Sequence, residues 1–363
     1  MTDVQFEVSH KIEPGEVVAL ARSIYGDNAD LGCESYFEWL YRDNPWGTAV
    51  VATARVNGRL VGHHAVLPLR AVLNGQEILV GQGINTMTRR DYEGRGIFAK
   101  LVSLADTACR EQAIQLIYAI PNSQAAPWFR TVLRYREVAS IPVWVRPVGL
   151  TGLLRDDVCP GRFLRGLSQI LDVGFVPLLR RWRSRRNPSR LEIRPLDRTG
   201  PEVDLLWQKG RDTHRFAMTR SGAYISWRFL RCPTRHYRIW GAYAKGELCA
   251  YVVARERMVR RWPGVRVGSL VDLFAEPYER GAIGLRLLVA EAVASLAQDG
   301  VGAIMVQAVS GHLASALRGN GFFRIPRRTE TWLPLMVRWL DPSKAGSESP
   351  VPIHFTAGDH DMG

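Results

Sequence analysis

The sequence predicts a mixed α/β fold of the α+β type, made of two similar domains. Three observations support this. Strand-like runs joined by hairpin turns lead into a glycine-rich turn and a helix, which is the order of an antiparallel sheet flanked by helices. Landmark residues recur at one fixed offset along the chain. The 363 residues are also enough for two domains at roughly 150 residues each.

Local signals place the elements of the first domain. Asn57-Gly58 and Asn74-Gly75 are strong hairpin turns, so the apolar runs around them are strands. A short helix is expected to end near Asn44-Pro45, because proline disfavours helix in the residue before it. We expect helices over 13–24, 36–41 and 96–110, and strands over 49–56, 60–73, 80–88 and 116–120.

The repeat indicates a duplicated domain rather than a solenoid, because solenoid repeats are about 20 to 50 residues long. Its landmarks are separated by 188 residues. They are Tyr36, Trp39, Pro45 and Asn57-Gly58, matched by Tyr224, Trp227, Pro233 and Lys245-Gly246. We divide the chain into a first domain at 1–150, a basic amphipathic linker at 151–195, a second copy at 196–340 and a loose tail at 341–363.

The most informative segment is the glycine-rich turn between the 80–88 strand and the following helix. Gly94 and Gly96 let the backbone approach a ligand without Cβ clashes, and the first N–H groups of a helix have no partner within it. Such a turn binds an anion, typically a phosphate. It lacks the Gly-Lys-Ser/Thr ending of a Walker loop and the third glycine of a dinucleotide fold.

This turn resembles the acyl-CoA pyrophosphate loop of the GNAT N-acyltransferase superfamily. Pro121-Asn122 and the helix up to Tyr135 are similar to the family's closing segment, although Glu93, Phe98 and Arg134 depart from its usual residues. The resemblance implies a mixed sheet that splays beside its fourth strand, and an acyl-CoA co-substrate without a metal. The cofactor-binding residues it implies are Ile84, Thr86, Met87, Thr88, Glu93, Gly94, Arg95, Gly96, Ile97, Phe98 and Asn122, with added charge from Arg89 and Arg90.

The resemblance also implies acyl transfer to a primary amine, with one group that removes the amine's proton and another that protonates the thiolate. Candidates for the base are His63 and His64, of which only one can face the cleft, and Glu38 on the short helix. Arg130 takes the place of the family's usual tyrosine acid. Tyr135 or Tyr92 could act instead, and the thiolate could also leave without an acid. Arg130 and Tyr92 are candidate substrate contacts.

The second copy departs from the first at this turn. Arg280 and Ala282 take the places of Gly94 and Gly96, and a Cβ at either position obstructs a pyrophosphate. We therefore expect one working site, in the first domain.

The positive charge is concentrated in the second part of the chain. The net charge is +13, yet residues 1–150 contain fifteen basic and fifteen acidic residues. The densest run is 180–194, behind an apolar helical pattern at 163–179. This segment could lie on an anionic membrane, receive an acidic carrier protein or pack as an interdomain helix. No nucleic-acid motif accompanies it.

Scattered cysteines and the lack of an apolar leader predict a cytoplasmic location, with peripheral attachment to the inner face of a membrane as an option. The five cysteines include no Cys-x-x-Cys pair, which argues against a zinc site. The function expected is transfer of an acyl group, most simply acetyl, from acyl-CoA to a small and acidic or amino-sugar amine. The alternative is an accessory protein that binds acyl-CoA without catalysis. The sequence leaves the acceptor, the acyl length and the oligomeric state open.

Overall fold

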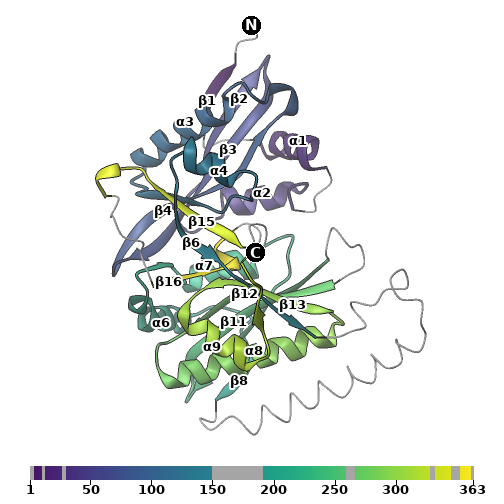
Figure 1. Ribbon diagram of the computed structural model, residues 1–363, viewed down its shortest axis with the longest axis vertical. Helices are drawn as coiled ribbons and strands as arrows, with labels where there is room; N and C mark the ends of the chain where they lie inside the picture. Colours follow the sequence, from purple (N-terminus) through teal and green to yellow (C-terminus); the bar gives the residue numbers. More distant parts are fainter. Residues whose placement is uncertain are drawn as a thin grey trace, which may run out of the picture.

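The computed structural model describes residues 4–9, 13–26, 30–148, 191–258, 266–327, 332–344 and 352–360. The chain forms two halves stacked along its longest axis, each with a sheet covered by helices (Figure 1). The mixed α/β fold class predicted from the sequence is confirmed, with mostly antiparallel strand pairs.

The first half contains the predicted helices and strands in the predicted order. It also has a strand before the first helix that the sequence analysis did not include. The elements are β1 (Gln5–Ser9), α1 (Pro14–Tyr25), α2 (Glu34–Tyr41), β2 (Val50–Val56), β3 (Arg59–Leu73), β4 (Gln76–Thr88), the 3-10 turn Arg90–Tyr92, α3 (Ile97–Glu111), β5 (Leu116–Ala119), α4 (Ala126–Thr131), β6 (Arg136–Ile141) and β7 (Val143–Pro147).

The second half repeats the core order of hairpin, strand, helix, strand and helix. Its elements are β8 (Glu192–Pro195), α6 (Pro201–Gly210), the 3-10 turn Arg211–Thr213, β9 (Phe216–Met218), α7 (Gly222–Ile225), the π-helix Ser226–Leu230, β10 (Arg238–Ala244), β11 (Glu247–Met258), β12 (Arg266–Ala275), α8 (Glu279–Gln298), β13 (Ala303–Val309), α9 (Gly311–Gly319), β14 (Phe323–Arg324), β15 (Leu333–Trp339), the 3-10 turns Pro342–Lys344 and Ala357–Asp359, and β16 (Ile353–Thr356).

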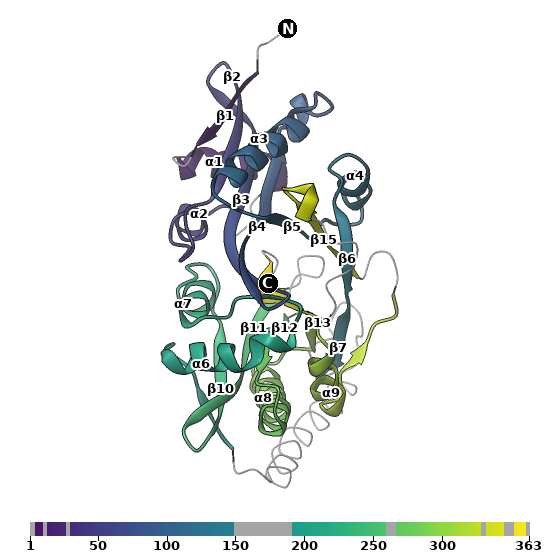
Figure 2. The ribbon, with the colours of Figure 1, turned by 90° about the vertical axis from the view of Figure 1, so that its left-hand side faces the viewer.

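The two halves exchange strands. β7 leaves the first half and pairs antiparallel with β13 and β14 of the second half. β15 comes from the end of the second half and pairs antiparallel with β5 and β6 of the first half. Figure 2 shows β6 and β7 running from one half into the other, with β15 beside β5. Each sheet is therefore completed by a strand from the other half.

The segment expected to be a loose tail is partly a core element. Residues 353–360 are all buried, and β16 pairs with β9 on one side and β13 on the other. Composition over 341–363 misled the prediction because it averaged over the short apolar run Ile353-His354-Phe355. The tail also finds distant partners, since the Tyr118 hydroxyl donates to the Asp359 carbonyl at 2.6 Å.

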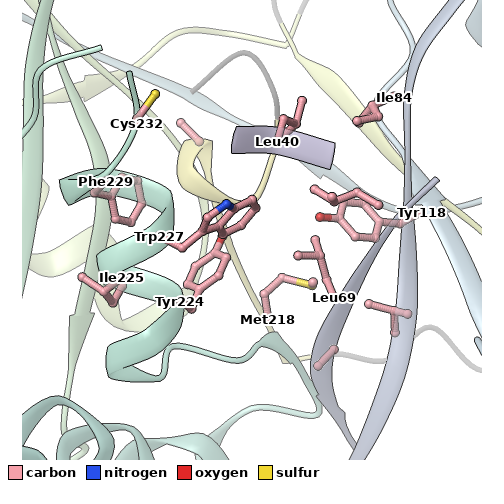
Figure 3. Close-up of a cluster of buried hydrophobic side chains, with 14 of the residues drawn as sticks. Leu40, Leu69, Ile84, Tyr118, Met218, Tyr224, Ile225, Trp227, Phe229 and Cys232 are labelled. Carbon is pink, nitrogen blue, oxygen red and sulfur yellow. The ribbon is translucent and has the colours of Figure 1, made fainter. Parts of the chain in front are cut away.

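A pair of tryptophans joins the halves at equivalent positions of the repeat. Trp39 Nε1 donates to the Trp227 carbonyl at 2.8 Å, and Trp227 Nε1 donates to the Trp39 carbonyl at 3.0 Å. The rings stack with centroids 5.2 Å apart. This reciprocal contact is what an approximate twofold axis produces. Figure 3 shows Trp227 in the buried cluster that includes Leu40 and Tyr224.

The linker prediction falls mostly outside the described residues. The apolar pattern at 163–179 and the arginines at 180–190 lie outside the described residues. At the end of this segment, β8 pairs with β10 of the second sheet, and the Arg194 guanidinium lies 3.8 Å from the Tyr243 ring centroid.

One described helix, α8, is long and apolar enough to cross a membrane. It lies against β10, β11 and β12, with more than half of its residues buried. Packing in the core therefore accounts for its apolar composition.

The tryptophan pair should be energetically coupled. Trp39→Phe and Trp227→Phe each leave a buried carbonyl without its donor, so each should lower the free energy of unfolding by about 1 to 3 kcal/mol. Because the rings also stack, the double variant should differ from the sum by more than about 0.5 kcal/mol. Urea unfolding measures all three values.

Trp332→Phe is the matched control, since Trp332 Nε1 also donates to a carbonyl, that of Ile325, at 3.0 Å, but Trp332 is only half-buried and belongs to none of the buried core clusters. When Trp332→Phe is combined with Trp39→Phe or Trp227→Phe, the losses in unfolding free energy should add. Additive losses at Trp39 and Trp227 would contradict the coupling.

Candidate functional site

β4 and β5 separate at the centre of the first half. Their parallel pairing runs only from Val80 opposite Leu116 to Gln82 opposite Tyr118. β4 continues to Thr88, and its β5 side has no strand partner there among the described residues. The backbone of 84–88 is thus an open strand edge, to which an extended amide chain can pair.

This open edge contains the β4 residues predicted to bind a cofactor. Ile84 and Met87 are buried in the core, while Thr86 and Thr88 are half-buried. The side chains therefore fix the strand on the core, and its backbone edge remains for a ligand.

The glycine turn lies just beyond the end of β4 and forms an anion-binding geometry. Gly94 and Gly96 have φ values of +74° and +75°, and a Cβ added at either would have nothing within 4 Å. α3 begins at Ile97 without a side-chain cap, so its first-turn N–H groups have no partner within the helix. These donors and the helix dipole suit the negative charge of a phosphate.

Packing on β3 fixes where this turn lies. A Cβ on Gly62 would come within 2.8 Å of Ile97 and 3.0 Å of Leu101, so the start of α3 rests directly on the bare backbone of β3. Within the turn, Arg95 donates to the Asp91 carbonyl at 3.0 Å and lies over the Tyr92 ring at 5.0 Å. Glu93, Gly94 and Arg95 remain exposed.

α4 forms the far wall of the opening. Phe98 of α3 packs edge-on against Trp128 of α4, with ring centroids 4.4 Å apart. Asn122 Oδ1 accepts a hydrogen bond from the Ala125 N–H at 2.8 Å and so holds the start of α4. Its Nδ2 remains as the donor available to a ligand.

His63 and His64 lie on opposite faces of β3, as the strand alternation predicts. His63 Nδ1 bonds to the Asn85 carbonyl at 2.8 Å, and its Nε2 lies 3.4 Å from the Tyr41 hydroxyl. His64 Nδ1 bonds to Thr86 Oγ1 at 2.8 Å. The His64 ring packs over Gly83, where a Cβ would lie 3.6 Å from it. His64 Nε2 is buried with no hydrogen-bond partner among the described residues.

Burial makes both histidines weak bases. It lowers the pKa of His63 to about 4, and burial with the nearby charges of His63 and Arg338 lowers the pKa of His64 to about 3. An imidazolium this acidic does not hold a proton taken from an amine near neutral pH. The general-base role predicted for either residue therefore gains no support.

The other predicted catalytic groups lie apart from one another. Glu38 lies on α2 with its side chain 40% exposed, and it pairs with Arg42 at 2.7 Å. Tyr135 is buried under the Arg338 guanidinium, 4.8 Å from its ring centroid, and burial raises the pKa of its hydroxyl. Tyr92 is half-buried in the turn. Only Tyr92 lies in the turn itself.

Arg130 lines a cavity of about 430 Å³ whose walls come from α4, β6 and β15. It pairs with Glu137 at 2.6 Å, and Arg327 approaches the other Glu137 oxygen at 3.6 Å. Trp332 forms part of the wall, with the Arg327 guanidinium 6.0 Å from its ring. These two arginines and one carboxylate leave the cavity with a surplus positive charge.

The corresponding opening in the second half is filled by the chain itself. β12 and β13 pair only up to Leu270 opposite Val306. Beyond that point β16 and the turn after it lie between them, with β16 paired to β13. The buried Arg220 guanidinium donates to Asp272 at 3.0 Å and Asp359 at 2.7 Å, which holds this plug in place.

The turn of the second half is closed as well. Arg280 forms ion pairs with Glu276 and with Glu247, the second at 3.1 Å. A Cβ on Gly281 would come within 2.3 Å of the Glu276 carbonyl, so that glycine serves packing. The expectation that Arg280 and Ala282 obstruct a phosphate agrees with this geometry.

Metal and disulfide sites are absent from the part of the chain that the structure describes. No group of three or more His, Cys, Asp or Glu side chains is placed to hold a metal ion there. Cys33, Cys109, Cys232 and Cys249 are free thiols.

Comparison with known protein families matches residues 15–129 to the acetyltransferase (GNAT) domain. These residues run from α1 to α4 and include the glycine turn and the open β4 edge. The chain carries a GNAT acetyltransferase domain. Comparison with curated protein sequences gives no match.

Solved GNAT structures share the fold along almost the whole chain. A GCN5-related N-acetyltransferase from Anabaena variabilis is 12% identical with a TM-score of 0.60, covering 93% of this chain and 74% of its own. A probable N-acyltransferase from Enterococcus faecalis is 12% identical with a TM-score of 0.62, covering 94% and 73%. N-myristoyltransferase from Saccharomyces cerevisiae, with bound myristoyl-CoA, is 12% identical with a TM-score of 0.60, covering 92% and 78%. At this identity the likeness concerns the fold.

Two residues of the site escaped the sequence analysis. Asn85 adopts a φ of +46° in the middle of β4, and an asparagine within an apolar strand is a signal for such a bulge. Tyr41 contacts His63 and Asn85 across 22 and 44 residues of sequence, and no local signal reveals this.

The glycine turn should control CoA binding. Gly94→Ala and Gly96→Ala place a Cβ on a backbone with positive φ and crowd the anion site, so each should weaken CoA binding at least about tenfold. Gly75→Ala is the matched control, because Gly75 has a φ of +80° in a hairpin with nothing within 4 Å of its Cβ position. Titration calorimetry should show weaker CoA binding in Gly94→Ala and Gly96→Ala and unchanged CoA binding in Gly75→Ala.

Acid should destabilise the fold through its buried histidines. Burial is the main cause that lowers the pKa of each, and the values are about 4 for His63, 3 for His64, 4 for His214 and 3 for His360. Between these values and about 6.5 only the unfolded chain takes up protons, so stability falls as the pH falls, by roughly 1 kcal/mol per pH unit per histidine. Asp106 opposes this, because burial raises its pKa to about 6.

Thermal unfolding at about pH 7 and about pH 5 checks this slope. His64→Asn keeps a side-chain amide near Thr86 and removes one titrating ring, so its slope should be smaller than that of the wild type. An unchanged slope would contradict the assignment.

Proposed function

We propose that the protein is an N-acyltransferase that moves an acyl group from acyl-CoA to a primary amine by direct attack in a ternary complex. The observation that carries this is the combination, in one half, of an uncapped glycine turn and an open β4 edge leading away from it. The two features match the two parts of CoA, a pyrophosphate and an amide-containing arm.

The first half has groups suited to both parts of the cofactor. The N–H groups of 94–98 would hold the pyrophosphate, and the backbone of 84–88 would pair with the pantetheine amides, with Asn122 Nδ2 on the opposite wall. Acyl-CoA supplies an activated thioester, so the protein's task is to bind it, orient it and receive a proton from the amine.

We assign proton acceptance to Glu38, directly or through water, because it is the predicted base with an exposed carboxylate. Tyr92 is the remaining candidate acid, since Tyr135 is buried under Arg338. The thiolate can also leave unaided, because a thiol with a pKa near 8.5 is a tolerable leaving group.

The acceptor is proposed to be small and to bear negative charge, as an acidic amine or amino sugar does. Support comes from the surplus positive charge of the cavity lined by Arg130, Arg327 and Trp332. Ser123, which directly follows Asn122 in the chain, also lines this cavity. A neutral or cationic acceptor would gain nothing from it.

The second half is proposed to be a degenerate GNAT copy that serves as scaffold. Its plugged opening and its paired Arg280 support this. A cytoplasmic location, and contact of residues 162–194 with an acyl carrier protein or an anionic membrane, stay predictions from the sequence.

The second candidate function is a non-catalytic protein that binds acyl-CoA, as a sensor or as an accessory at a membrane. Two observations favour it. His63 and His64 are buried and weakly basic, and Arg130, at the position of the usual acid, is paired with Glu137.

A thiol-release assay separates the two functions. With acetyl-CoA, longer acyl-CoAs and a panel of amines, we expect thiol release that depends on the acceptor and is strongest for amines that also carry a carboxylate or phosphate. Glu38→Gln should lower kcat about 100-fold or more, as loss of a general base does, and leave KM for acyl-CoA unchanged. Tight CoA binding with no acceptor-dependent release would favour the accessory function.

A further inference from the structure

Tyr41, His63 and Asn85 form a closed ring of hydrogen bonds beneath the open edge of β4. Asn85 Nδ2 donates to the Tyr41 hydroxyl at 3.0 Å, His63 Nδ1 bonds to the Asn85 carbonyl at 2.8 Å, and the Tyr41 hydroxyl lies 3.4 Å from His63 Nε2. The Tyr41 and His63 rings are stacked, with centroids 5.9 Å apart. His63 is fully buried and Tyr41 is 4% exposed.

The partners give the bonds of the ring a consistent direction. A carbonyl only accepts, so His63 Nδ1 carries a proton and donates to Asn85. In the neutral imidazole, His63 Nε2 accepts from the Tyr41 hydroxyl, which in turn accepts from the Asn85 amide. Each group then uses a donor and an acceptor, with the imidazole neutral. Its low pKa agrees with this.

The ring holds a bulge in β4. The register between β3 and β4 shifts between His63 and Ala65, and Asn85 has a φ of +46°. Because the Asn85 carbonyl bonds to the His63 side chain, the N–H of Thr86 in the same trans peptide points away from that side chain. The peptide lies in the part of β4 whose β5 side has no strand partner among the described residues.

We propose that Tyr41 and His63 are positioning residues that fix the Asn85–Thr86 peptide for contact with the pantetheine arm of the acyl carrier. The inference rests on the proposed function, because it assigns that arm to the β4 edge. Neither side chain needs to touch the ligand. They act through the peptide plane that they hold.

The second half supplies an internal comparison. At the repeat offset of 188, Phe229 takes the place of Tyr41 and Tyr251 that of His63. β11 and β12 have a similar register shift after Val253, but there Tyr251 donates to the carboxylate of Asp272 at 2.6 Å, beside the plug formed by β16. The ring of hydrogen bonds among neutral side chains therefore occurs in the half whose opening is free of β16.

The test compares two probes that share the phosphate end of the cofactor. CoA carries the pantetheine arm, whereas adenosine 3′,5′-bisphosphate lacks the arm and the phosphate that bears it, and keeps one phosphate of the pyrophosphate. In Tyr41→Phe, CoA binding should weaken about three- to tenfold, the effect of one or two lost hydrogen bonds, while binding of the bisphosphate stays the same. Calorimetry gives both constants, and retained bisphosphate binding shows that the variant is folded.

Tyr224→Phe is the matched control, because the Tyr224 hydroxyl is also buried and also donates a hydrogen bond, in its case to the Gly358 carbonyl at 3.0 Å. It should leave both constants unchanged. A second pair of variants guards against a general loss of folding. His63→Asn retains an amide donor for the Asn85 carbonyl and should lose less CoA affinity than His63→Leu.

The outcomes distinguish the two proposals. Wild-type protein that binds neither probe would overturn the proposed function and this inference with it. CoA binding that is equal in the wild type and Tyr41→Phe, or equal losses in both His63 variants, would overturn the positioning role alone. Equal weakening of CoA and bisphosphate would also overturn it, because the effect would then not lie in the arm.

Discussion

The reciprocal contact between Trp39 and Trp227 is the constraint on which the arrangement of the two halves depends. Each indole donates to the other residue's carbonyl, so the contact is complete only when both halves meet in one orientation. The same approximate symmetry appears in the exchanged strands, since β7 completes one sheet and β15 the other. Neither half has a complete sheet without the other.

The two halves differ at the place where their central parallel strands separate. In the first half the separation of β4 from β5 leaves a strand edge open, and in the second half the equivalent separation is filled by β16. A buried charge network at Arg220 stabilises the filled side. The open side is instead organised by neutral side chains around Asn85. The two halves thus share an architecture that leaves a strand edge open in one half and forms a packed core in the other.

Local signals in the sequence were sufficient for most of the first half. The Asn-Gly turns, the glycine turn and the repeat each reflect short-range backbone preferences, and the helices and strands they predicted are confirmed. Strand exchange was not predictable in this way, because β15 pairs with β5 across more than 200 residues and no local pattern encodes that partner.

The burial of individual side chains was the other gap. A histidine on a strand has the same sequence signature whether it is a buried structural group or a catalytic base, and only the structure shows that His63 and His64 are buried. β16 was missed for a related reason. Its few apolar residues are stabilised by Arg220 and Tyr118, which are far away in sequence.

The pairing of β15 with β5 has a consequence for biosynthesis. β5 forms one wall of the opening, and its outer neighbour is made from residues near the end of the chain. A nascent chain emerging from the ribosome can form the glycine turn and β4 early, yet that wall lacks its neighbour until residue 339 has been translated. Ligand affinity should therefore appear only after residue 339 has been translated.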